Sequence, residues 1–241
     1  MMDRTLSSSY ASLGGRASAL TAVQTRVINQ VYLWMTLGLA LTGATAYFVA
    51  TTDSVKKIIF GSGWMFWILV IAQVGLVFAI SGLIHRLSAA AATGLFFLYS
   101  ALNGLTFSSI FLVYNLGSIA GVFLITAGTF GIMSLYGITT KTDLTKIGNL
   151  LFMALIGVVI AGLVNLFIGS SILSLIISVV GVVVFTGLTA YDAQRIKDMS
   201  AAALDGESEG KIAVIGALAL YLDFINLFLM LLRLLGSRDE E

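Results

Sequence analysis

The charged residues of this chain leave very long gaps. Residues 87–140 contain no Asp, Glu, Lys or Arg over 54 positions, and residues 147–191 contain none over 45 positions. A helix that crosses a membrane needs about 20 apolar residues to span roughly 30 Å of hydrocarbon. Each gap is too long for one crossing and the right length for two. The charge pattern therefore predicts an integral membrane protein.

The same length criterion, about 20 apolar residues per crossing, predicts an all-α protein with seven transmembrane helices when it is applied to the whole chain. The two long gaps are expected to turn at residues 114–118 and 169–171. A β-barrel is not expected, because barrel strands are about 10 residues of alternating polarity and these runs are continuous. The predicted spans lie one in 27–52, one in 58–84, two in 87–140, two in 147–191 and one in 212–232.

Composition excludes several classes of function. The chain is 59% apolar and 10% charged, whereas a soluble globular chain is roughly a quarter charged. It has no Cys and a single His, His85, which excludes disulfides, thiolate metal sites and zinc sites built on several histidines. The net charge of +1 gives no bulk attraction to nucleic acid. We therefore expect neither an enzyme nor a resident cofactor, and no nucleic-acid partner.

Lys and Arg in the short loops predict the orientation of the chain, because cytosolic loops carry the excess of positive charge. With seven spans, nine of the 13 Lys and Arg residues fall on the side of the N-terminus and four on the other side. The N-terminus is therefore expected in the cytosol and the C-terminus outside. The predicted divisions are a polar cytosolic tail (1–26), a seven-helix transmembrane domain (27–236) and an acidic tail (237–241).

Two carboxylates, Asp192 and Asp223, fall in or at the end of apolar segments, where burying a charge costs free energy. Asp223 has 11 uncharged residues before it and nine after it, about 18 Å along a helix from Lys211. Asp192 is expected near the cytosolic end of the sixth span, where the helix dipole disfavours a carboxylate. An ionisable group inside a membrane is a functional hypothesis by default. If they lie close together, Asp192 and Asp223 are expected to share a proton or to hold a hard cation such as Ca²⁺, and so to act as a pH sensor.

Two arginines are candidate counter-charges for Asp192. Arg86 ends the second span, and Arg195 follows Asp192 by three residues on the same helix. An Arg86–Asp192 ion pair would lock spans two and six together, and protonation of Asp192 would release this latch. Simpler readings stay open: Asp192 could be solvated beside Arg195, Asp223 could be a hydrogen-bonded structural residue, and Arg86 could serve only the charge bias of cytosolic loops.

Weaker signals come from amides and from a repeated triplet. Asn103 and Asn226 are expected to hydrogen-bond across helices, which contributes about 1 kcal/mol each. Gly-Leu-Thr occurs at 104–106 and again at 187–189. If spans one to three and four to six are inverted repeats, as in many transporters, these triplets correspond. Chance is the alternative, because Gly, Leu and Thr are abundant here.

Three motifs resemble the bacterial branch of the Bax inhibitor motif (TMBIM) family. They are Asn-Gly-Leu-Thr-Phe-Ser-Ser-Ile-Phe at 103–111, Tyr-Asp-Ala-Gln-Arg-Ile-Lys at 191–197 and Leu-Tyr-Leu-Asp-Phe-Ile-Asn-Leu-Phe at 220–228. The similarity covers about residues 27–236. It implies seven helices arranged as two three-helix layers around a central C-terminal helix, in a bacterial cytoplasmic (inner) membrane.

The resemblance also implies a function. Family members are described as pH-dependent Ca²⁺ leak channels, in which aspartates matching Asp192 and Asp223 sense protons and an arginine matching Arg86 latches the closed state. Some relatives carry an acid within span two, where this chain has only Gln73. Other bacterial members modulate a membrane-bound protease. We therefore predict a pH-sensitive passive Ca²⁺ leak; the alternatives are a regulatory partner of a membrane protease or other membrane complex, and a proton-coupled transporter.

Overall fold

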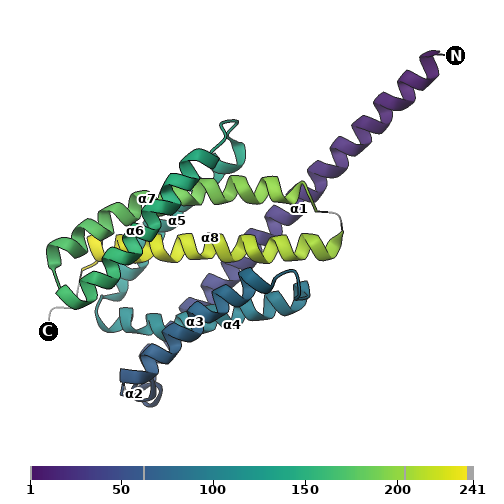
Figure 1. Ribbon diagram of the computed structural model, residues 1–241. Helices are drawn as coiled ribbons and strands as arrows, with labels where there is room; N and C mark the ends of the chain where they lie inside the picture. Colours follow the sequence, from purple (N-terminus) through teal and green to yellow (C-terminus); the bar gives the residue numbers. More distant parts are fainter. Residues whose placement is uncertain (1, 62, 204, 238–241) are drawn as a thin grey trace.

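The computed structural model describes residues 2–61, 63–203 and 205–237, with side chains from residue 20 onward. Every regular element in this part of the chain is a helix (Figure 1). The predicted acidic tail, apart from residue 237, lies outside the described residues. The elements are α1 (Met2–Thr51), α2 (Asp53–Phe60), α3 (Gly63–Leu83), α4 (Ala89–Phe107), the short 3₁₀ helix η1 (Ser108–Leu112), α5 (Leu116–Thr139), α6 (Thr145–Ile168), α7 (Ser171–Ser200) and α8 (Gly206–Leu235).

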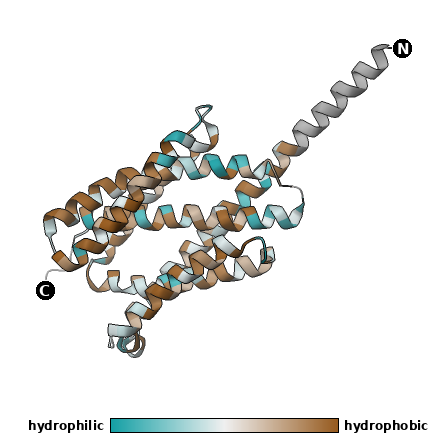
Figure 2. Cartoon of the chain, viewed as in Figure 1, coloured by the Kyte–Doolittle hydropathy of each residue, from teal (hydrophilic) through white to brown (hydrophobic). Residues whose placement is uncertain are grey.

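Seven of the described helices are long and apolar enough to cross a membrane, as predicted. They are α1 from residue 20 onward, α3, α4 with η1, α5, α6, α7 and α8. Hydrophobic residues cover most of their length, and hydrophilic residues gather where α7 is joined to α8 (Figure 2). The all-α membrane fold inferred from the charge-free gaps is therefore confirmed.

Both predicted turns are confirmed, and their local chemistry explains them. Asn115 caps α5 by accepting a hydrogen bond from the backbone N–H of Ser118 at 2.7 Å. Gly169 ends α6 with φ of 67°, a left-handed conformation that costs glycine little because it has no Cβ. Ser170 then caps α7 by accepting from the N–H of Leu173 at 3.3 Å. Each cap satisfies a backbone donor that the first turn of a helix leaves unpaired.

The last helix, α8, occupies the centre of the bundle. It packs against α1, α4, α5 and α7, while α3 packs on α4 and α6 packs on α7. Spans one to three (α1, α3, α4) and spans four to six (α5, α6, α7) thus form two groups with α8 between them (Figure 1). Leu220, Tyr221 and Leu227 on α8 are fully buried. This arrangement agrees with the predicted two layers around a central C-terminal helix.

Three features of the helices were not predicted from the sequence. The short helix α2 lies between the first two spans, where only a loop was expected. Helix α7 continues to Ser200 rather than ending just after Asp192. Helix α1 is continuous from residue 2 to residue 51, so residue 26 marks a change in composition and not the end of an element.

The two Gly-Leu-Thr triplets lie in different packing environments. A Cβ built on Gly104 would lie 2.6 Å from the carbonyl oxygen of Thr42, so span three packs closely on span one there. A Cβ built on Gly187 would lie 2.5 Å from Leu151 Cδ1 on α6, the fifth span. An inverted repeat would place the second glycine against span four. The triplets therefore give no structural support to a repeat.

Candidate functional site: an aspartate pair between α7 and α8

Asp223 is a buried carboxylate on the central helix. Its exposed fraction is 4%, and its Oδ2 atom has no hydrogen-bond partner among the described residues. A buried carboxylate that stays ionised without a partner costs several kcal/mol or more. The environment of Asp223 therefore favours either a proton on this group or a bound cation beside it.

The structure brings Asp192 to Asp223. Helices α7 and α8 pack along each other, and the half-buried side chain of Asp192 lies close enough to Asp223 for the two carboxyl groups to interact. Two ionised carboxylates at this separation repel strongly where the dielectric constant is low. One proton held between them removes this repulsion and turns the contact into a hydrogen bond. The pair can therefore bind and release a proton as a unit.

The expected position of Asp192 at a helix end is wrong. Because α7 extends to Ser200, Asp192 lies eight residues, or about 12 Å, from the end of the helix. The effect of the helix dipole falls off within the last turn. The setting of Asp192 is therefore determined by Asp223, by Arg195 and by burial rather than by the dipole of α7.

Of the two candidate counter-charges, the structure places Arg195 close to Asp192. The positive charge of Arg195 stabilises the Asp192 carboxylate from one helical turn away, although its own side chain is exposed. Arg86 is exposed in the turn after α3. Among the described residues no ion pair joins Arg86 to Asp192. The ion pairs in this part of the chain are Arg26–Glu209, Lys56–Asp53 and Lys211–Glu207.

The amides Asn103 and Asn226 form hydrogen bonds within their own helices. Asn103 Nδ2 donates to the carbonyl oxygen of Tyr99 at 3.0 Å, and Asn226 Nδ2 donates to that of Leu222 at 2.8 Å. Their donors therefore do not supply the bonds between helices that were expected. Gln73 does: its Nε2 donates from α3 to the carbonyl oxygen of Leu102 at 3.1 Å, on α4.

Gln194 and Lys197 follow Asp192 on α7 and anchor this helix to neighbouring parts of the chain. The sequence did not predict this role for either residue. Gln194 accepts from the N–H of Leu144 at 2.9 Å and donates to the carbonyl oxygen of Thr142 at 2.8 Å. Lys197 Nζ donates to the carbonyl oxygen of Ile138 at 2.6 Å, in the last turn of α5. Both belong to the motif at 191–197. Their spacing of three residues just after an apolar span was the feature of the sequence that could have indicated a polar contact on one face of the helix.

The sequence of this chain matches a known protein family. The family model described as "Inhibitor of apoptosis-promoting Bax1" matches residues 24–240. This range includes both aspartates and nearly the whole bundle. The chain belongs to the Bax inhibitor family.

Relatives of this Bax inhibitor family member are found across bacteria. An "Inner membrane protein YbhL" of Escherichia coli K12 is 53% identical over 211 residues, covering 87% of this chain and 90% of the relative. An uncharacterised protein of Borreliella burgdorferi is 50% identical, with 91% and 95% covered. An uncharacterised membrane protein of Streptococcus pyogenes is 39% identical, with 87% and 92% covered. Together with the seven apolar helices, these relatives identify a multi-pass inner membrane protein.

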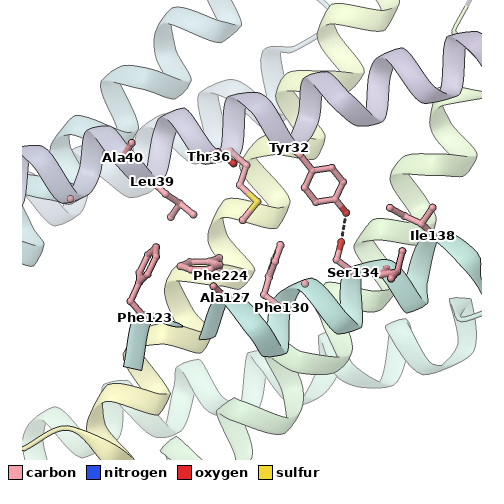
Figure 3. A pocket seen from close by; sticks show the side chains of 14 residues that line it. Tyr32, Thr36, Leu39, Ala40, Phe123, Ala127, Phe130, Ser134, Ile138 and Phe224 are labelled. Carbon is pink, nitrogen blue, oxygen red and sulfur yellow. Dashed lines mark hydrogen bonds between the residues drawn. The ribbon is translucent and has the colours of Figure 1, made fainter. Parts of the chain in front are cut away.

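An apolar crevice of this Bax inhibitor family member lies outside the aspartate pair. Its volume is about 690 Å³, and it lies between α1 and α5, with Phe224 of α8 in its wall (Figure 3). The hydroxyl groups of Tyr32 and Ser134 form a hydrogen bond across it. Neither Asp192 nor Asp223 lines this crevice. Its apolar wall suits lipid chains rather than a hydrated cation.

Proposed function

We propose that this protein is a passive, proton-gated cation leak of the inner membrane that passes Ca²⁺. One observation carries the proposal: the carboxyl groups of Asp192 and Asp223 lie close enough to interact, and Asp223 Oδ2 has no hydrogen-bond partner among the described residues. A purely structural carboxylate would have both oxygens satisfied. An oxygen left free in a buried pair is suited to a proton or a cation that comes and goes.

Proton binding by the pair is the proposed gate. Ionised Asp192 attracts Arg195 from one turn away on the same helix, and such a pair stabilises the helical conformation of this part of α7. Protonation of Asp192 removes its negative charge and with it the attraction. Arg86 stays a second candidate for the latch: it would have to move from its exposed position to reach Asp192. Low pH is therefore expected to open the leak.

In the proposed leak, Ca²⁺ is the ion that passes through the protein and not a permanently bound ion. It prefers six to eight oxygen ligands, and the described residues contain no group of three His, Asp or Glu side chains that could hold a metal. Two carboxylates supply at most four oxygens. Such a site would bind Ca²⁺ weakly while the ion passes, and passage requires that the ion can leave.

The proposal is tested by Ca²⁺ flux into proteoliposomes that contain a fluorescent Ca²⁺ indicator. Flux through the unmodified protein is expected to rise severalfold as the pH falls from 8 to 6. Asp223→Asn should change the pH dependence of the flux, because Asp192 then titrates without a second carboxylate beside it with which to share a proton. Asp198→Asn is the matched control, since it removes an exposed carboxylate from the same helix; its pH profile should follow that of the unmodified protein.

Two results would overturn the proposal. One is a pH profile of Asp223→Asn that equals that of the unmodified protein. The other is Ca²⁺ flux that does not exceed that of protein-free liposomes at any pH between 6 and 8. The second result would return the aspartate pair to a structural role and would leave the regulation of a partner protein as the better hypothesis.

A further inference from the structure

A pocket with one polar end and one apolar end lies between α3 and α7, over one face of α8. Its volume is about 650 Å³. The polar residues of its lining are the cations Arg195 and Lys211, together with His85 and the hydroxyl-bearing Ser81 and Ser208. No acidic residue lines this pocket. Its lining therefore contains cationic side chains and no carboxylate of its own.

The apolar wall of the pocket follows a single stripe of α8. Residues 208, 211, 212, 215, 218, 219 and 222 all line it, and their spacing of three and four residues places them on one face of the helix. The stripe begins with a serine and a lysine and ends with aliphatic side chains. From residue 208 to residue 222 it runs about 21 Å.

This polarity and length match a membrane phospholipid. One leaflet of a bilayer, headgroup included, is about 20–22 Å thick. Basic pockets between transmembrane helices are known to bind anionic lipid headgroups. A free phosphate would use the cationic end and leave the aliphatic stripe uncovered. We propose that the pocket binds one anionic phospholipid, with its phosphate between Arg195 and Lys211 and an acyl chain along the α8 stripe.

Each of the two cations already has an anionic neighbour, and this limits the expected affinity. Lys211 Nζ lies 3.5 Å from Glu207 Oε1, and that same oxygen accepts a hydrogen bond from the N–H of Ala89 at 2.8 Å. Arg195 interacts with Asp192. A lipid phosphate would compete for both cations, so we expect reversible binding rather than a permanently bound lipid.

The test is binding of defined lipids to the purified full-length protein, followed by mass spectrometry of the intact complex. Phosphatidylglycerol and phosphatidylcholine with identical acyl chains are compared, and glycerol phosphate is added as a soluble competitor. Phosphatidylglycerol should bind at least about tenfold more tightly, because each cation near the headgroup contributes roughly 1 kcal/mol. Glycerol phosphate should not displace it at matched concentration.

Variants separate the two ends of the pocket. The double variant Arg195→Gln/Lys211→Gln should lose about tenfold in affinity for phosphatidylglycerol. Lys57→Gln/Arg233→Gln removes the same net charge at exposed positions outside this pocket and should bind as the unmodified protein does. Ala219→Trp fills the apolar stripe and should weaken binding while both cations remain. Thermal unfolding of each variant shows whether it is folded.

Three outcomes would overturn the lipid site. They are equal binding of the two lipids, equal losses in the two double variants, and full displacement by glycerol phosphate. The last outcome would indicate a site for phosphate alone. Because the readout is binding and not flux, a negative result here leaves the proposed gating by the aspartate pair standing.

Discussion

Polar side chains inside the bundle differ in whether the protein itself satisfies their hydrogen bonds. Thr42 Oγ1 is satisfied: it lies 2.9 Å from the carbonyl oxygen of Gly38, 2.8 Å from that of Ser100 and 2.7 Å from the hydroxyl of Tyr221. This cluster joins α1, α4 and α8. Asp223 lies two residues from Tyr221 and has a free oxygen. The contrast between neighbouring residues singles out Asp223 as the group with unused binding capacity.

How much of this site the sequence could predict depends on the residue. Asp223 stands out because it interrupts an apolar run, and Asp192 stands out within a motif. Their contact could not be derived from spacing, since it depends on how α7 and α8 are aligned. Thr42 gave no signal at all: a threonine in an apolar helix is common, and only its three partners from other turns and helices make it structural.

Capping of α8 gives a residue-scale prediction with a defined pH dependence. Asp205 Oδ1 accepts from Ser208 Oγ at 2.7 Å and from the Ser208 N–H at 2.8 Å. The hydroxyl and then the N–H of Ser208 hold the pKa of Asp205 below its usual value. A lowered pKa in the folded state adds stability above the unfolded-state pKa, about 4, and loses it as the pH falls through the folded-state value.

Asp205→Ala should therefore lower the midpoint of thermal unfolding by roughly 2–4 °C at pH 7. The difference from the unmodified protein should be the same at pH 6 and pH 8, because Asp205 is ionised throughout that range. Circular dichroism at the three pH values measures it. A difference that grows between pH 8 and pH 6 would show that this cap titrates where the leak is proposed to open, against our interpretation.

At the scale of the elements, α5 and α7 are in contact where one helix has no side chain. A Cβ built on Gly137 of α5 would overlap the carbonyl oxygen of Ala190 on α7. Backbone atoms cannot move aside as a flexible side chain can. The position of α7, and hence of Asp192 two residues further on, therefore depends on glycine at residue 137.

Gly137→Ala should separate the two helices and cost about 1–3 kcal/mol of stability, well above the gain in helix propensity of up to about 1 kcal/mol. Gly128→Ala is the matched control on the same helix, where a Cβ would meet no atom within 4 Å; it should be neutral or stabilising. Unfolding in mixed detergent micelles compares the two variants. Equal stability of the two variants would mean that the helices separate at no cost.

The helices themselves were predictable to within a few residues, for a physical reason. Charges cannot enter the hydrocarbon, so the gaps between them mark the spans, and Gly169 and Asn115 mark breaks inside the gaps. The same reasoning fails outside the membrane. There α2 and the last two turns of α7 form from sequences that include charged residues, and α7 is held there by contacts such as the hydrogen bond of Lys197 to Ile138.

At the scale of the whole molecule, the position of α8 between two groups of three helices explains why the pair is buried. A carboxylate on a peripheral helix would face lipid or reach the headgroups. On the central helix, Asp223 is enclosed by neighbours on several sides. Only a residue on an adjacent helix, here Asp192 on α7, can then serve as its partner.

The orientation of the bundle decides which compartment the proposed sensor reads. The chain has no cysteine, so one introduced cysteine is the only thiol. Lys57 on α2 and Lys141 after α5 are both exposed, and the excess of positive charge predicts that Lys57 faces outward and Lys141 faces the cytosol. An impermeant maleimide should label Lys57→Cys in intact spheroplasts and should label Lys141→Cys only after the membrane is permeabilised.

The reverse labelling pattern would change the mechanism as well as the topology. The loop that joins α7 to α8, with Arg195, Lys197 and Lys211 around it, lies on the same side as Lys141, since α6 and α7 together return the chain to that side. If that side is cytosolic, the charges around Asp192 face the cytosol and internal pH sets the gate. If it faces outward, the pair would respond to external pH, and the positively charged lipid pocket would lie in the outer leaflet.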